Sequence, residues 1–150
     1  MEYKRFGDTY AVRLDRGEEI LEKIKEFAQA EHIAFASVRA LGAVGSFTVG
    51  VFDPVAKTYA SNDFAGNFEI VSLTGTIDAM GGNVYTHIHM SAGNAKGEVF
   101  GGHLNRAVVS ATCEMLVTRI RGELGRKFDE GVGLSLEVLI FERERKGAGQ

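Results

Sequence analysis

Residues 84–104, VYTHIHMSAGNAKGEVFGGHL, organise this chain and contain three of its four histidines. The β-branched and aromatic residues around His87 and His89 favour a strand. Side chains alternate between the two faces of a strand, so these two histidines point the same way, about 6–7 Å apart. At that separation both imidazoles can converge on one metal ion.

The second half of the stretch supplies a third histidine. A glycine-rich polar loop, Ser91–Gly97, is followed by a short run, Glu98-Val99-Phe100, and then by Gly101-Gly102-His103. If the loop reverses the chain, His103 returns beside the first pair, and the two glycines allow a close backbone approach. Three neutral imidazoles with an open fourth position are typical of catalytic zinc. The alternative is a partly solvated polar patch that binds no metal.

Composition limits the class of protein. The chain has 150 residues, 45% of them hydrophobic and 25% charged, as expected of one globular domain with a sizeable core. Its formal net charge of −3 argues against a general nucleic-acid binder. A single cysteine rules out an internal disulfide and fits a cytoplasmic location. No apolar run approaches membrane-spanning length, and the first ten residues lack the apolar core of a signal peptide.

The N-terminal third predicts a strand, a helix and then more β-structure. Residues 10–14 alternate apolar and polar, with Arg13 on the polar side, which predicts a first strand. Asp15 is the predicted cap of the following helix, with Glu18 completing a capping box. Apolar residues recur at helical spacing over 20–28, and we expect that stripe to cover a sheet. Residues 35–52 are β-rich, and their glycines predict a bend, a bulge or a tight connection between two strands.

The rest of the chain reads as strands and tight turns. The expected elements are a short strand at 57–60, a loop at 62–67, a central strand at 68–77, a hairpin turn at 80–83, a strand at 107–118 containing a buried, inert Cys113, a polar connection at 119–127 and a final strand at 134–141. The sum is an α+β fold with a mostly antiparallel sheet and an N-terminal helix. We expect one domain over 1–150, with its core at about 10–141 and a flexible tail at 142–150.

Residues 66–76, GNFEIVSLTGT, resemble the G-x-F-E-I-x-S-L-x-G signature of the plant and prokaryote conserved (PPC) domain. The run Leu41-Gly42-Ala43-Val44 fits that domain as well, and the resemblance covers roughly residues 10–141. It implies a sheet of about seven strands with a flanking helix, and a homotrimer. Plant members act on AT-rich DNA through AT-hooks. This chain has no Arg-Gly-Arg-Pro hook, so that function does not carry over.

The resemblance also bears on the histidines. Prokaryotic PPC proteins similar to this chain keep an H-x-H…G-G-H pattern that is linked with bound zinc, and His87, His89 and His103 match it. The same pattern more remotely resembles the zinc site of acetolactate decarboxylase, in which an arginine and glutamates assist the metal. Those helpers do not align here, so Arg39 and Glu98 are predicted as catalytic residues on chemical type alone.

Three functional hypotheses follow. The first is a zinc-binding homotrimeric PPC protein of unassigned activity. The second is a metal-dependent lyase or hydrolase acting on a small oxo acid or ester, with Glu98 or Tyr85 as acid or base and Arg39 or Arg13 holding an anionic substrate. The third is a DNA-binding or transcription-regulatory scaffold, which the charge does not support.

Overall fold

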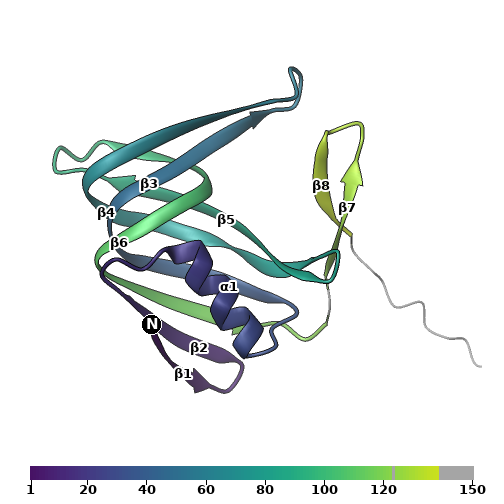
Figure 1. Ribbon diagram of the computed structural model, residues 1–150, viewed down its shortest axis with the longest axis horizontal. Coiled ribbons are helices and arrows are strands. Elements are labelled where there is room, and N and C mark those ends of the chain that lie inside the picture. Colours follow the sequence, from purple (N-terminus) through teal and green to yellow (C-terminus); the bar gives the residue numbers. More distant parts are fainter. Residues whose placement is uncertain (123, 139–150) are drawn as a thin grey trace, which may run out of the picture.

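The computed structural model describes residues 1–122 and 124–138, which form one helix and eight strands (Figure 1). Their bounds are β1 (Glu2–Phe6), β2 (Thr9–Asp15), α1 (Ile20–Ala30), β3 (Ala36–Asp53), β4 (Thr58–Met80), β5 (Asn83–Gly93), β6 (Val99–Arg119), β7 (Gly125–Asp129) and β8 (Leu134–Val138). The flanking helix is confirmed, but one helix of 11 residues beside eight strands makes the fold mostly β. The predicted α+β class and strand number are corrected accordingly.

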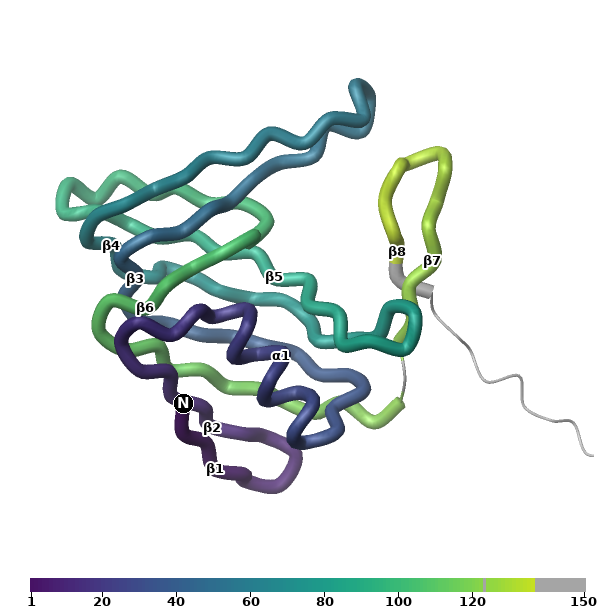
Figure 2. Tube along the Cα trace, in the orientation of Figure 1, coloured from purple at the N-terminus to yellow at the C-terminus, as the bar shows by residue number. Residues whose placement is uncertain are grey.

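Six strands form the main sheet, in the order β1-β2-β6-β3-β4-β5, and every pairing is antiparallel as predicted. The start of β6 also pairs with the end of β5, so β3, β4, β5 and β6 close on themselves. Figure 2 shows this closure in the trace, with α1 lying across the sheet. Strands β7 and β8 form a separate two-stranded sheet.

Helix α1 covers one face of the sheet with its apolar stripe, as its spacing predicted. The stripe is fully buried and consists of Ile20, Ile24, Phe27 and Ala28. The Phe27 ring packs edge-on against Tyr10 of β2, with 5.1 Å between ring centroids. Within the described residues, no helix is long and apolar enough to cross a membrane.

The predicted helix cap was wrong. The helix begins at Ile20, and the side chain of Glu19 accepts a hydrogen bond from the amide of Glu22 at 2.7 Å. Asp15 instead ends β2, and its amide donates to the Glu18 carboxylate at 2.8 Å. The chain needs the intervening residues to turn from the end of β2 onto the face of the sheet, so the cap lies four residues later than predicted.

The central strands are longer than the sequence indicated. Strand β4 runs from Thr58 to Met80 without interruption, so the predicted short strand at 57–60 and the loop at 62–67 are both parts of it. In β3, Gly42 and Gly45 lie at register shifts within one strand and make no connection between two. Beyond Gly50, β3 pairs only with β4, and residues 51–60 form a two-stranded arm that extends from the sheet (Figure 1).

Two short strands were missed. Every residue of β1 is exposed, and β7 begins inside the predicted polar connection at 119–127 and runs two residues beyond it. Neither has the apolar alternation that marks a half-buried strand, because neither contributes much to the core. The predicted final strand is confirmed over 134–138 as β8. Its residues 139–141 and the predicted tail at 142–150 lie outside the described residues.

Candidate metal centre

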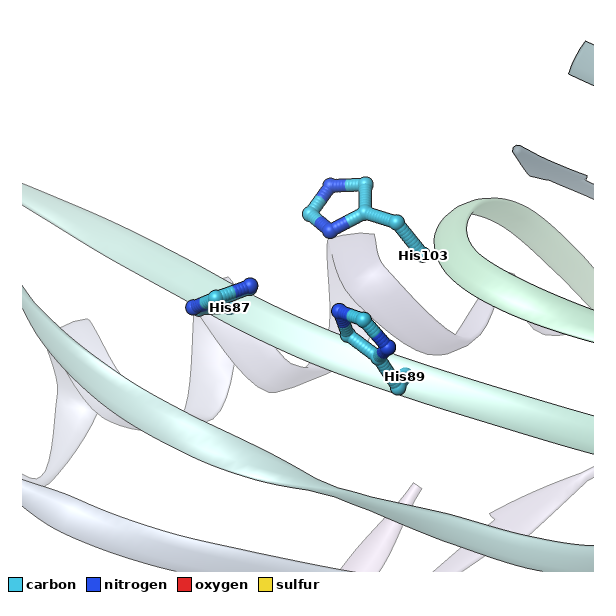
Figure 3. A group of neighbouring side chains, drawn as sticks. All are labelled: His87, His89 and His103. Carbon is cyan, nitrogen blue, oxygen red and sulfur yellow. The ribbon is translucent and has the colours of Figure 1, made fainter. Parts of the chain in front are cut away.

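The three histidines of residues 84–104 converge on one point (Figure 3). His87 and His89 project from β5, and His103 projects from β6. The ring centroids are 5.3 Å apart for His87–His89, 5.3 Å for His87–His103 and 5.5 Å for His89–His103. Each imidazole offers one nitrogen, and these three atoms all lie within 4.8 Å of one another.

Strand pairing places the third histidine. The loop between β5 and β6 reverses the chain, and His103 becomes the direct cross-strand partner of His89. His103 is also the partner of Gly50 on β3, so it stands where β6 changes its neighbour from β5 to β3. The sequence-based prediction of a returning third histidine is therefore confirmed.

The glycines before His103 are required by close backbone contacts. A Cβ on Gly101 would lie 2.7 Å from the Met90 carbonyl oxygen, and a Cβ on Gly102 would lie 2.6 Å from the Gly50 carbonyl oxygen. Both distances are shorter than any ordinary contact of a Cβ atom, so only glycine fits here. The two glycines let β6 approach β5 and β3 closely enough to bring His103 to the other two histidines.

The last glycine of the 66–76 signature has a similar role. Gly75 on β4 is the cross-strand partner of Ile88, the residue between His87 and His89. A Cβ on Gly75 would strike the His87 carbonyl oxygen and would lie 2.8 Å from the Ile88 Cα. Gly75 thus fixes how closely the histidine-bearing strand lies against β4.

The donor set fits a zinc ion. Zinc binds histidine nitrogens at about 2.0–2.1 Å, which places tetrahedral ligand atoms about 3.3–3.4 Å apart. Nitrogens within 4.8 Å of one another reach that spacing through small side-chain rotations. Burial, followed by the positive charges of His87, His89 and Arg126, lowers the pKa of His103 and so favours the neutral form that binds metal.

Beside the cluster lies a buried ion pair that sequence reasoning missed. Asp78 on β4 is 1% exposed, and it accepts hydrogen bonds from Arg126 Nε at 2.8 Å and Nη2 at 2.7 Å. The guanidinium also covers the ring of Tyr85, 4.4 Å from its centroid. Asp78 falls between the predicted central strand and the predicted hairpin turn, and Arg126 falls in the predicted polar connection. Only a strand prediction for 125–129 would have signalled the pair.

The structure does not bring the predicted catalytic residues into the cluster. Glu98 is exposed at the turn between β5 and β6, where it accepts a hydrogen bond from Asn94 Nδ2 at 2.7 Å. Arg39 on β3 lies opposite Thr74 on β4, which in turn lies opposite His89 on β5. Arg39 is therefore on the same face as His89 but two strands away, about 10 Å at the usual strand spacing. Their catalytic roles stay predictions.

Arg39 and Arg13 instead line a groove of about 740 Å³ over β1, β2, β3 and β6. None of the three histidines is among its lining residues. Arg13 forms ion pairs there with Glu2 at 3.1 Å and Asp15 at 3.2 Å. Its predicted role in holding a substrate carboxylate would therefore compete with these partners.

Cys113 is buried and free, as expected from its place in an apolar strand. Burial, with a smaller effect of Glu114, raises its thiol pKa to about 12. A thiol with such a pKa is not ionised at neutral pH and is a poor nucleophile.

Comparison with known proteins identifies the family of this chain. A metal-containing protein from Archaeoglobus fulgidus is 36% identical, covers 92% of this chain and 97% of its own, and superposes with a TM-score of 0.84. A candidate DNA-binding protein from Bacteroides thetaiotaomicron is 29% identical, with coverages of 91% and 96% and a TM-score of 0.88. No curated protein matches.

The remote resemblance to acetolactate decarboxylase is confirmed at the level of fold. The Bacillus subtilis enzyme is 13% identical, with a TM-score of 0.54, and the match covers 84% of this chain and 58% of that chain. The family model of the Plants and Prokaryotes Conserved (PCC) domain matches residues 1–121. The chain therefore belongs to the PCC domain family, as its 66–76 signature indicated.

Proposed function

We propose that this protein binds one zinc ion per chain through His87, His89 and His103, and that the fourth position of the metal stays open to a small ligand. The convergence of three imidazole nitrogens within 4.8 Å carries the proposal. The 36%-identical relative named as metal-containing supports it. Three neutral histidines with one open position are the ligand set of catalytic zinc sites.

The charge of this ligand set favours anionic ligands. Histidine nitrogens are neutral, so none of the three ligands would reduce the double positive charge of the ion. When bound, zinc supplies a Lewis acid or a water of lowered pKa. We therefore propose a metal-dependent lyase or hydrolase of small oxo acids or esters as the activity. Tyr85, two residues from His87 on the same strand face, is the nearest of the predicted acid–base candidates in sequence.

The site can be tested with cobalt, which replaces zinc in such sites and absorbs visible light when tetrahedral. We expect the metal-free protein to bind one cobalt ion per chain and to develop the intense bands of tetrahedral coordination. Single alanine variants of His87, His89 and His103 should lose these bands. His32, the fourth histidine, is exposed and has a φ of 51°, so His32→Asn is the matched control and should bind as the wild type does. Equal cobalt binding by wild type and all four variants would reject the site.

We also propose the homotrimer that the family resemblance implies. Apolar side chains are exposed on β3 and the arm, with Leu41 59%, Val51 64% and Val55 91% exposed. Large apolar side chains that are this exposed are often covered by protein–protein contacts. Light scattering coupled to gel filtration should give three times the chain mass of 16.3 kDa, and a monomer would contradict the assembly.

The DNA-binding hypothesis has less support. It rests on the name of the Bacteroides relative, whereas this chain has a net charge of −3. A DNA-binding protein releases counterions, so its affinity for duplex DNA falls steeply with salt. Salt-dependent binding of a duplex at low ionic strength would revive this hypothesis.

The single cysteine, buried and free, is consistent with the cytoplasmic location that we retain as part of the proposal.

A further inference from the structure

Among the described side chains of β7 and β8, Arg126 alone forms a buried ion pair with the main sheet. Its side chain is 3% exposed and that of its partner Asp78 is 0% exposed. The guanidinium binds both oxygens of Asp78, and its Nη1 donates to the Ser135 carbonyl of β8 at 3.3 Å. One residue therefore joins β7, β8 and β4.

Other contacts hold the β7–β8 hairpin in the same place. The amide of Ala79 on β4 donates to the Leu124 carbonyl oxygen at 3.2 Å, directly before β7. At the other end, Lys57 Nζ from the arm donates to the Glu130 carbonyl oxygen at 2.9 Å, in the turn between β7 and β8. These hydrogen bonds make the hairpin a bridge between the main sheet and the arm.

Strand register places this ion pair next to the histidines. Asp78 and Tyr85 are cross-strand partners, and the next pair on the same face, two residues along, is Thr76 and His87. Thr76 Oγ1 also donates to Asp78 Oδ2 at 3.2 Å. Tyr85 and His87 are two residues apart on β5, so their side chains lie on the same face about 7 Å apart. Because the Arg126 guanidinium lies over the Tyr85 ring, its charge is about this far from the position of His87.

The orientation of the pair gives its charges unequal effects at the site. Arg126 is among the positive charges that lower the pKa of the His103 imidazole. Asp78 is buried on β4, one strand away from the histidine-bearing β5, whereas the Arg126 guanidinium lies over Tyr85 of β5 itself. The pair therefore presents its positive end to the histidines.

We infer that Arg126 is a positioning and specificity-determining residue of the metal site: held by Asp78 and Tyr85, it supplies a fixed positive charge beside the open metal position and so selects small anionic ligands such as carboxylates. This inference rests on the proposed function, since it concerns the ligand that completes the metal. It adds a residue from beyond 1–121, the part of the chain that the family model matches.

The test measures anion binding to the cobalt-loaded protein, with azide and acetate as probes and the visible bands of the metal as readout. Arg126→Met removes the charge but keeps most of the side-chain volume. Asp78→Asn removes the opposing charge. Lys127→Met, at the exposed neighbouring position of β7, is the matched control for the loss of one positive charge. Hydrogen exchange of the Ala79 amide reports whether the hairpin stays docked.

We expect Arg126→Met to weaken anion binding about tenfold, the effect of one charge at such a distance in a partly buried site. Asp78→Asn should bind anions at least as tightly as the wild type does. Lys127→Met should have the same anion affinity as the wild type. If Arg126→Met fails to load cobalt, Asp78→Leu/Arg126→Met replaces it, because an apolar pair preserves packing. The same weakening is expected of that variant.

Two results would overturn the inference while leaving the metal site intact. The first is that cobalt-loaded Arg126→Met, or the double variant used in its place, binds anions with the same affinity as the wild type. The other is equal weakening by Arg126→Met and Asp78→Asn together with loss of Ala79 protection, which would mean that the pair only docks the hairpin. Failure of the wild type to bind cobalt would instead reject the proposed function itself.

Discussion

Gly75→Ala tests whether close contact between β4 and β5 builds the metal site. The new Cβ would meet the His87 carbonyl oxygen and would lie 2.8 Å from the Ile88 Cα. Carbon atoms prefer about 3.5 Å or more, so β5 has to move away by at least about 0.7 Å. Both obstructing atoms belong to the backbone, so no side-chain rotation relieves the clash.

The expected cost is about 2–3 kcal/mol in the free energy of unfolding, in the range found for overpacked interiors. His87 and His89 flank Ile88, so zinc affinity should fall as well. Urea denaturation of the metal-free protein gives the first quantity, and competition with a chromophoric chelator gives the second.

Gly125→Ala is the control, because a Cβ there meets no atom within 4 Å. It should change the free energy of unfolding by less than about 0.5 kcal/mol. If Gly75→Ala were as stable as this control and bound zinc equally well, the role that we assign to the signature glycine would be wrong.

Two further predictions follow from pKa values. Cys113, with its thiol pKa raised to about 12 by burial, should react with Ellman's reagent only after unfolding; rapid labelling of the native protein would contradict its burial. Burial lowers the pKa of His103 below its ordinary value of 6.5, so the unfolded chain binds the proton first as pH falls. The free energy of unfolding of the metal-free protein should therefore decrease as pH drops below about 6.5, and a His103→Asn variant should show a shallower decrease in urea titrations across that range.

The cluster of three histidines could be predicted from sequence because its information is local. Alternation on one strand orients His87 and His89, and a short loop with two glycines returns His103. The signature at 66–76 added the family, whereas the antiparallel sheet already followed from the succession of short strands and tight turns. In each case the decisive residues lie within about 20 positions of one another.

The rest could not be predicted because it depends on distant contacts. Strand β4 continues through the polar stretch at 62–67 because β3 pairs with it there, and no local pattern records that partner. Arg126 reaches Asp78 across 48 residues, and a charged pair separated so far leaves no periodic signal. Arg39 and Glu98 were predicted as catalytic on chemical type alone, and both lie outside the histidine cluster.

The most direct test of the account is the metal content of the protein purified without added metal, measured by plasma mass spectrometry beside His87→Ala/His89→Ala. The account predicts about one zinc per chain in the wild type and none in the variant. Absence of zinc from both, even after incubation with zinc and removal of the excess, would contradict the central claim. The three histidines would then be a polar patch on the β5–β6 face.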